Sequence, residues 1–211
     1  MIKRISLYFY RNTLFRFFRF FKKNRYRKLV SKKDITIISS NCLAGCIYSD
    51  LDKVFSSPTI NLFFYAPCFI KFCETIDHYL ELDLIECYKS KYDQAIIGKY
   101  PVGLLGDIEI HFLHYSSFSD AKISWNARKE RVNRENIVFM MTDRDGFDLS
   151  IGKRFDALPG RNNVLFSAKK YPDLSSSLFC SGESKIISDD FTSFRKYERY
   201  MNIVNWYNNE K

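Results

Sequence analysis

The stretch "NIVFMMTDRDG" (residues 136–146) decides the fold class. Residues 136–142 form an almost continuous apolar run, and the polar turn "DRDG" (residues 143–146) follows directly. An apolar run of this length is expected of a strand that is covered on both faces. Such strands are typical of parallel sheets with helices on either side. We therefore predict an α/β fold with a mostly parallel sheet flanked by helices, in a Rossmann-like three-layer arrangement.

The rest of the chain from residue 34 alternates between strand patterns and helix patterns. No internal repeat or low-complexity segment interrupts this alternation, which is typical of α/β folds. We expect one α/β domain over residues 34–211. Strands are predicted over residues 34–41, 58–65, 106–115, 136–142 and 162–168. Helices are predicted over residues 67–82 and 117–133, from residue 147, and over residues 189–209.

A basic arm, residues 1–33, precedes this domain. The chain has 211 residues and a net charge of +9, but the arm alone holds twelve Lys and Arg residues and no acid. The remaining residues hold 21 basic and 24 acidic side chains, so the body is mildly acidic. Such an asymmetry points to an anionic surface as partner, either a membrane or a nucleic acid.

The arm has the pattern of an amphipathic helix lying on a membrane. Its longest charge-free run, from Ile5 to Tyr10, is too short to span a bilayer. At 100° per residue, an apolar set and a basic set of side chains fall on opposite sides of a helix. The apolar set is Leu7, Tyr10, Leu14, Phe17, Phe18 and Phe21, and the basic set is Arg16, Arg19 and Lys23.

Two alternatives remain for the arm. It can pack on its own domain, or its aromatic and Arg residues can bind single-stranded nucleic acid. The acidic body and the lack of a nucleic-acid-binding signature argue against nucleic acid, which we do not expect as a partner. We expect residues 1–33 to bind an anionic membrane surface, so that a cytoplasmic protein is held peripherally on the inner face of the cell membrane.

The six cysteines predict no cross-links and no zinc site. None of them forms a C-x-x-C pair, and no signal peptide with an uninterrupted apolar core is present. We expect reduced thiols in a cytosolic protein. The three histidines, His78, His111 and His114, do not lie beside a cysteine pair with zinc-finger spacing.

Residues 106–115, "GDIEIHFLHY", combine ionisable and apolar side chains on one predicted strand. Alternation places Asp107, Glu109 and His111 on one face, and His114 with the apolar residues on the other. Two carboxylates at this spacing can share a divalent cation. Glu109 or His111 is then a candidate general base. The alternative is an edge strand with a solvated acidic face.

The turn after the apolar run offers a second carboxylate pair, Asp143 and Asp145, around Arg144. Ligands of open α/β sheets collect beyond the carboxyl ends of the strands. A D-x-D triplet there is how nucleotide-sugar transferases hold a metal on a diphosphate, which offsets the charge of the leaving group. The alternative is a polar turn in which Asp and Gly serve the backbone.

The stretch "ISSNCLAG" and the helix over residues 117–133 offer further candidates. Cys42 follows a predicted strand and can act as a nucleophile with His111 or His114 as its base, or it can be a thiol beside a ligand-binding turn. The loop lacks the glycine patterns of dinucleotide-binding and P-loop sites.

Arg128 shares a helical stripe with Trp125, so its guanidinium must find an internal carboxylate or a ligand phosphate.

Six stretches, in order from Ile37 to Pro172, resemble a bacterial family known as domain of unknown function 1919, often labelled exopolysaccharide or capsule biosynthesis proteins. The sequence departs from the family pattern after Cys42, where an aromatic residue and a Gly pair are expected. The arm lies outside the resemblance. A looser similarity, to glycosyltransferases with a D-x-E metal motif, is carried by residues 106–109 alone. The six stretches are "ISSNCLAG", "SSPTINLFFYAPCFIKF", "YPVGLLGDIEIHFLHYSS", "SWNARKERVNRENIVF", "TDRDG" and "FDALPGRNNVLFSAKKYP".

Together these features predict a glycosyltransferase of capsule or exopolysaccharide biosynthesis. We expect a nucleotide-sugar donor, a lipid-linked or glycan acceptor, and Mg²⁺ or Mn²⁺ on Asp107 and Glu109 or on Asp143 and Asp145. The alternatives are a Cys–His hydrolase or acyltransferase acting on a glycan, and a non-catalytic capsule-assembly protein. Catalytic roles are expected for Asp107, Glu109 and His111, and ligand contacts for Ser40, Asn41, Cys42, His114, Trp125, Arg128 and Arg144.

Overall fold

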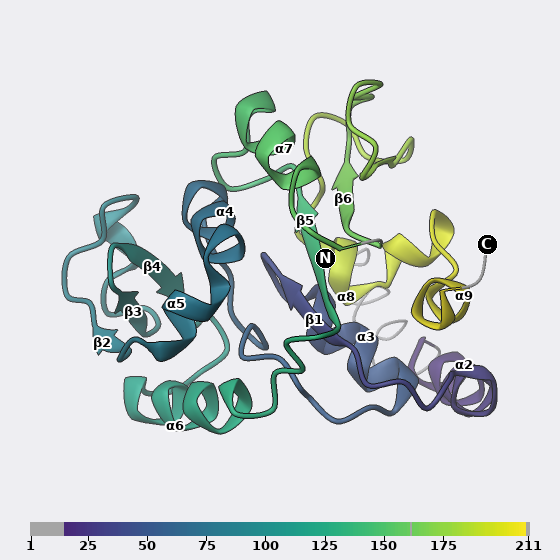
Figure 1. Ribbon diagram of the computed structural model, residues 1–211, viewed down its shortest axis with the longest axis horizontal. Coiled ribbons are helices and arrows are strands. Elements are labelled where there is room, and N and C mark those ends of the chain that lie inside the picture. Colours follow the sequence, from purple (N-terminus) through teal and green to yellow (C-terminus); the bar gives the residue numbers. More distant parts are fainter. Residues whose placement is uncertain (1–14, 161, 210–211) are drawn as a thin grey trace, which may run out of the picture.

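The main sheet of the protein has four strands, and every neighbouring pair of them is parallel. The computed structural model describes residues 15–160 and 162–209. The strands stand in the order β1-β5-β6-β7, near the middle of the molecule (Figure 1). This confirms the predicted α/β fold. The strands are β1 (Thr36–Ser39), β5 (Ile137–Thr142), β6 (Val164–Ser167) and β7 (Ser177–Phe179).

Helices cover both faces of this sheet, and alternate residues of each strand enter two separate cores. Val138 and Met140 pack on one face with α3, α8, η3 and α9, whereas Phe139 and Met141 pack on the other with α4, α6 and α7. The strand therefore reads as a continuous apolar run. The elements are α3 (Leu43–Leu51), α8 (Asp190–Ser193), η3 (Lys196–Arg199), α9 (Ile203–Asn208), α4 (Ala66–Glu74), α6 (Phe118–Lys129) and α7 (Leu149–Asp156).

A second, antiparallel sheet holds the stretch in which Asp107 lies. It consists of β2 (Ile85–Glu86), β3 (Val102–Leu105) and β4 (Ile108–His111), with a 3₁₀ turn, η2 (Gln94–Ile96), before β3. Gly106 has a φ of 61° and forms the tight turn between β3 and β4, a conformation that glycine adopts without strain. Asp107 is thus a turn residue. The predicted strand over residues 58–65 is reduced to one bridge between Phe63 and His111.

Two predicted helices are interrupted. The segment 67–82 forms α4 and a separate α5 (Ile76–Glu81), which meet at Thr75. The segment 189–209 is divided into α8, η3 and α9, and Arg195 between them has a φ of 54°. Its guanidinium donates to the buried Asp50 carboxylate of α3 and to two backbone carbonyls. Satisfying a buried carboxylate outweighs the cost of one left-handed residue.

The helix α2 (Phe15–Leu29) packs on the body through its basic face. Arg19 is buried and pairs with Asp50 and Glu198, so this part of the membrane prediction is wrong: Arg19 does not face outward. The aromatic side chains Phe17, Phe18 and Phe21 do face solvent. Leu7, Tyr10 and Leu14 lie outside the described residues. Among the described residues, no helix combines the length and the apolarity that a bilayer span requires.

Candidate functional site

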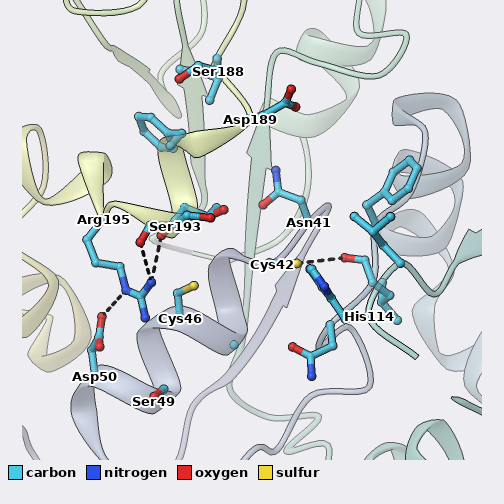
Figure 2. A pocket seen from close by; sticks show the side chains of 18 of the residues that line it. Asn41, Cys42, Cys46, Ser49, Asp50, His114, Ser188, Asp189, Ser193 and Arg195 are labelled. Atoms are coloured by element: carbon cyan, nitrogen blue, oxygen red, sulfur yellow. Dashed lines mark hydrogen bonds and ion pairs between the residues drawn. The ribbon is translucent and has the colours of Figure 1, made fainter. Parts of the chain in front are cut away.

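A pocket of about 1170 Å³ opens at the carboxyl ends of β1 and β5. The chain leaves β1 for α3 on one face of the sheet and leaves β5 for α7 on the other. This divergence creates a crevice at the strand ends, the usual ligand position in open α/β folds. Figure 2 shows the pocket with α3 along one side; Asp50 and Arg195 lie on the left of the view and His114 on the right.

The loop between β1 and α3 is fixed by its own side chains. Asn41 Nδ2 donates to Thr142 Oγ1 at the end of β5 (3.0 Å), and Asn41 Oδ1 accepts the Leu43 N–H (3.2 Å). Ser39 Oγ accepts the Ala44 N–H (3.1 Å). The predicted ligand residue Asn41 therefore lines the pocket and also holds the two strand ends together. Ser40 is buried beneath the loop and is not part of the lining.

The loop between β5 and α7 places Arg144 and Asp145 in the same pocket. Arg144 pairs with Asp189, and its Nε lies 3.7 Å from an Asp145 oxygen. Asp145 has a φ of 53°, and its carbonyl accepts the Ala66 N–H at the start of α4 (2.7 Å). Burial raises the pKa of the Asp145 carboxyl, while Arg144 opposes the shift. A raised pKa makes a carboxylate a stronger base, so Asp145 is a candidate to accept a proton from a bound ligand.

Asp143 has a structural environment instead. Its side chain accepts the backbone N–H groups of Ala168 (2.7 Å) and Ile187 (2.9 Å), and the residue is buried outside the pocket lining. Burial raises the pKa of the Asp143 carboxyl against these two hydrogen bonds. The two acids of the D-x-D triplet therefore do not act as a pair: Asp143 ties β5 to β6 and to the segment before α8, and Asp145 faces the pocket.

The acids of the strand 106–115 are separated from each other and from the pocket. Asp107 lies on the β3–β4 turn, where Lys71 Nζ (2.5 Å) and the Tyr79 hydroxyl (2.6 Å) bind its carboxylate. These hydrogen bonds lower the pKa of Asp107 to about 2. Glu109 is buried and accepts the Ser90 hydroxyl (2.8 Å) and the Lys91 N–H (2.6 Å). The structure does not bring Asp107 and Glu109 together as a metal pair.

His111 is fully buried beside Glu109. Its ring stacks on Phe63 (4.7 Å between centroids), and its Nε2 lies 3.5 Å from a Glu109 oxygen. Among the described residues, neither ring nitrogen has a hydrogen-bond partner. Burial lowers the pKa of His111 to about 4, although the Glu109 charge opposes the shift. His111 is therefore a neutral core residue at pH 7, while His114, three residues further, lines the pocket.

Cys42 lines the same pocket as His114, as a Cys–His site would require. Its thiol lies 3.9 Å from the Leu62 carbonyl, and burial raises its pKa to about 12. A nucleophilic cysteine needs a lowered pKa instead.

The two predicted ligand residues of α6 are occupied within the protein. The side chain of Trp125 is buried in the core. Arg128 donates to the Tyr115 hydroxyl (2.5 Å) and the Ile60 carbonyl (3.4 Å), so its guanidinium finds internal acceptors.

The side chains of the pocket do not fit Mg²⁺ or Mn²⁺ in the predicted manner. Both oxygens of Asp143 are occupied by backbone N–H groups, and Asp145 and Asp189 share Arg144. Across the described residues, no group of three or more His, Cys, Asp or Glu side chains converges on a metal position.

The sequence does not predict the other end of the pocket, which is built around Asp50. This carboxylate is fully buried, and Arg19 of α2 and Arg195 both pair with it. Lys23 Nζ lies 3.9 Å from its second oxygen and donates to the Ser49 hydroxyl (3.0 Å). The only sequence signal is an acid within the otherwise apolar α3, because a buried acid requires a cationic partner.

Residues 13–208 match the family described as "Domain of unknown function (DUF1919)". The chain belongs to this family. The family resemblance is thus confirmed. The expectation that the arm lies outside the resemblance is wrong for residues 13–33, because the match includes α2. An uncharacterized protein of Haemophilus influenzae is 35% identical over 198 residues, which cover 90% of this chain and 92% of the relative.

Proposed function

We propose that the protein is a glycosyltransferase that binds a nucleotide sugar in the pocket at the ends of β1 and β5. The observation that carries this proposal is the position of the pocket. It lies where the β1–α3 and β5–α7 connections diverge, with the first turn of α3 and Arg144 in its lining. An Arg side chain in this position is suited to bind a diphosphate, because its guanidinium can donate two hydrogen bonds to phosphate oxygens.

In this proposal the charge of the leaving nucleoside diphosphate is offset by the Arg144 guanidinium. The acceptor hydroxyl oxygen attacks the anomeric carbon of the donor sugar, and the bond from that carbon to the diphosphate oxygen breaks. Asp145 accepts the hydroxyl proton, because its raised pKa and its place in the pocket suit a general base. We assign this role to Asp145 because Glu109 and His111 lie buried outside the pocket lining.

The proposed setting is the inner face of the cell membrane, within capsule or exopolysaccharide biosynthesis. The aromatic side chains of Phe17, Phe18 and Phe21 are between 57% and 65% exposed. The neighbouring Arg25 and Lys28 are exposed as well. An apolar helix face with cations beside it is suited to an anionic bilayer.

Liposome flotation tests this setting. Replacing Phe17 and Phe21 with Ser removes two apolar anchors, so binding to vesicles with anionic lipid should weaken by about tenfold or more for each residue. The matched control is Ile123→Ser. Ile123 is 65% exposed, but it lies on α6 and not on α2. Equal flotation of all three proteins would exclude α2 as the membrane anchor.

A thermal-shift panel of nucleotide sugars, with and without Mn²⁺, tests the donor site. A bound donor stabilises the folded state by RT ln(1 + [L]/Kd), so one donor class should raise the Tm. Arg144→Gln should abolish this shift, whereas Arg154→Gln should keep it, because Arg154 pairs with Glu74 outside the pocket. If no nucleotide sugar raises the Tm, the glycosyltransferase proposal fails.

A Cys–His hydrolase or acyltransferase is the second candidate, since Cys42 and His114 line one pocket. It requires Cys42 to react as a thiolate, whereas the raised pKa of Cys42 favours the thiol. Cys42→Ser distinguishes the two enzymes: it should leave sugar transfer intact and should abolish acyl transfer or hydrolysis. A non-catalytic capsule-assembly protein would tolerate both this change and Asp145→Asn.

A further inference from the structure

The end of the pocket beside α2 carries an excess of positive charge. Arg19, Lys23 and Arg195 surround the single carboxylate of Asp50, and all four residues line the pocket. Glu198, the next carboxylate, is shared by Arg19 and Lys22. In this cluster four cations share two carboxylates, so the charge is not balanced within the protein. A cationic cluster beside an open pocket is suited to an anionic ligand.

Two details favour a ligand at this end of the pocket. The buried Nε of Arg19 has no hydrogen-bond acceptor among the described residues, although such groups normally have one. The Lys23 side chain is 30% exposed, and it is held in place by the Ser49 hydroxyl. Figure 2 shows Ser49 and Asp50 along α3, at a distance in the view from His114. Arg144, which is proposed to bind the nucleotide sugar, belongs to the β5–α7 loop instead.

Phe20 connects this cationic end to the exposed aromatic face of α2. Its side chain is 60% exposed, and it also lines the pocket between the positions of Arg19 and Lys23. Phe21, its neighbour in the chain, is exposed and packs edge-on against it (5.6 Å between centroids). One helix thus presents apolar side chains outward and supplies cations to the pocket. A free polar anion would contact only the cations, whereas an anionic lipid can contact the cations with its phosphate and the aromatic side chains with its apolar chain.

We infer that this end of the pocket binds the phosphate of a lipid-borne acceptor, with the first part of the lipid chain against Phe20. The inference rests on the proposed function, because it names the acceptor class of the same pocket. The lipid phosphate lies between Lys23 and Arg19, and the donor diphosphate lies at Arg144. The volume of about 1170 Å³ exceeds the usual range for one small ligand, so both substrates fit.

Binding of farnesyl phosphate by calorimetry tests the inference, with inorganic phosphate and farnesol as the other probes. Lys23→Gln should weaken farnesyl phosphate binding by about tenfold, since a charged hydrogen bond is lost. Lys28→Gln is the matched control: Lys28 lies on the same helix and is exposed, but it is outside the cationic cluster and the pocket lining, so this variant should keep the wild-type affinity. Equal affinity of both variants would overturn the inference.

A second matched pair separates the pocket from the membrane. Phe17 and Phe20 are 59% and 60% exposed, but only Phe20 lines the pocket. Phe20→Ser should weaken the binding of monomeric farnesyl phosphate, and Phe17→Ser should not. Inorganic phosphate that binds as tightly as farnesyl phosphate would assign the site to free phosphate and overturn the lipid assignment.

The proposed function and this inference fail in distinguishable ways. Farnesyl phosphate should bind in the presence of a saturating nucleotide sugar, since the two occupy different ends of the pocket. If nucleotide sugars do not raise the Tm but Lys23 and Phe20 still determine farnesyl phosphate binding, the lipid site stands and the transferase proposal falls. If farnesyl phosphate does not bind while a nucleotide sugar does, the lipid site falls alone.

Discussion

Arg19 of α2 and Asp50 of α3 form an ion pair in which the first side chain is 10% exposed and the second is fully buried. Asp50 also receives Arg195, so one carboxylate joins the N-terminal helix, α3 and the segment before η3. Because these side chains are little exposed, each depends on its partners, and removing the shared carboxylate leaves both guanidinium groups uncompensated.

Asp50→Asn should therefore reduce the free energy of unfolding by about 3 kcal/mol. Urea unfolding followed by circular dichroism measures the change. The control is Asp52→Asn, two residues further, because the Arg27–Asp52 pair has both side chains about half exposed. That variant should lose less than about 1 kcal/mol. Equal losses would show that burial of the Asp50 cluster contributes nothing.

His111 should make the protein less stable as the medium becomes acidic. Burial lowers its pKa to about 4 in the folded protein, whereas an unfolded chain has a value of about 6.5. Between these values the unfolded state binds the proton more tightly, so the free energy of unfolding should fall as the pH falls from about 6.5 to about 4. Urea unfolding at several pH values in this window measures the slope.

The His111 slope has its own control. His111→Phe keeps an aromatic ring against Phe63 and removes the titrating group, so the slope should become shallower. A His111→Phe protein with an unchanged slope would assign the pH dependence to other groups.

The two acids of the "DRDG" turn should respond differently to substitution. Asp143→Ala leaves the buried N–H groups of Ala168 and Ile187 without an acceptor, at a cost of about 1–3 kcal/mol for each. Asp145→Asn should change stability by less than about 1 kcal/mol, keep donor binding and abolish transfer. Urea unfolding measures the stability of each variant, thermal shift measures donor binding, and an assay of sugar transfer measures activity. A stable Asp143→Ala protein would contradict the structural role of that acid.

Cys42 should react slowly with alkylating reagents despite lying in a pocket. Burial raises its pKa to about 12, so little thiolate exists at neutral pH. Iodoacetamide at pH 7.5, followed by mass spectrometry of the peptides, should modify Cys42 no faster than a thiol in a short model peptide. Rapid, selective modification of Cys42 would instead support the Cys–His enzyme.

The main sheet could be predicted from sequence because its strands carry their own signal. The run 137–142 is apolar on both sides, and the structure covers both sides. The second sheet could not be predicted in this way. The alternation over residues 106–115 indicates a strand, but it does not show which strand pairs with it. The break of the last helix is also invisible locally. It depends on a hydrogen bond from Arg195 to Asp50, 145 positions away.

Part of the candidate site could also be predicted, because the strands that position it could be recognised in the sequence. The carboxyl ends of parallel strands meet at one edge, so residues after each strand gather there: Asn41, Cys42, Arg144 and Asp145. Spacing alone does not reveal which side of the backbone is buried. Asp107 and Glu109 share a spacing that suits a metal, yet a turn and a buried hydrogen-bond network separate them.

The hydrogen bond from Asn41 to Thr142 joins residues 101 positions apart. Everything from α3 to α6 lies in the loop that must close before β1 and β5 can pair. Closing so long a loop costs entropy before any contact is gained, which slows folding. The pocket at the ends of β1 and β5 therefore cannot form before this loop has closed, whereas the aromatic face of α2 lies within one continuous helix. If α2 binds a bilayer as proposed, its apolar face can form before the pocket does.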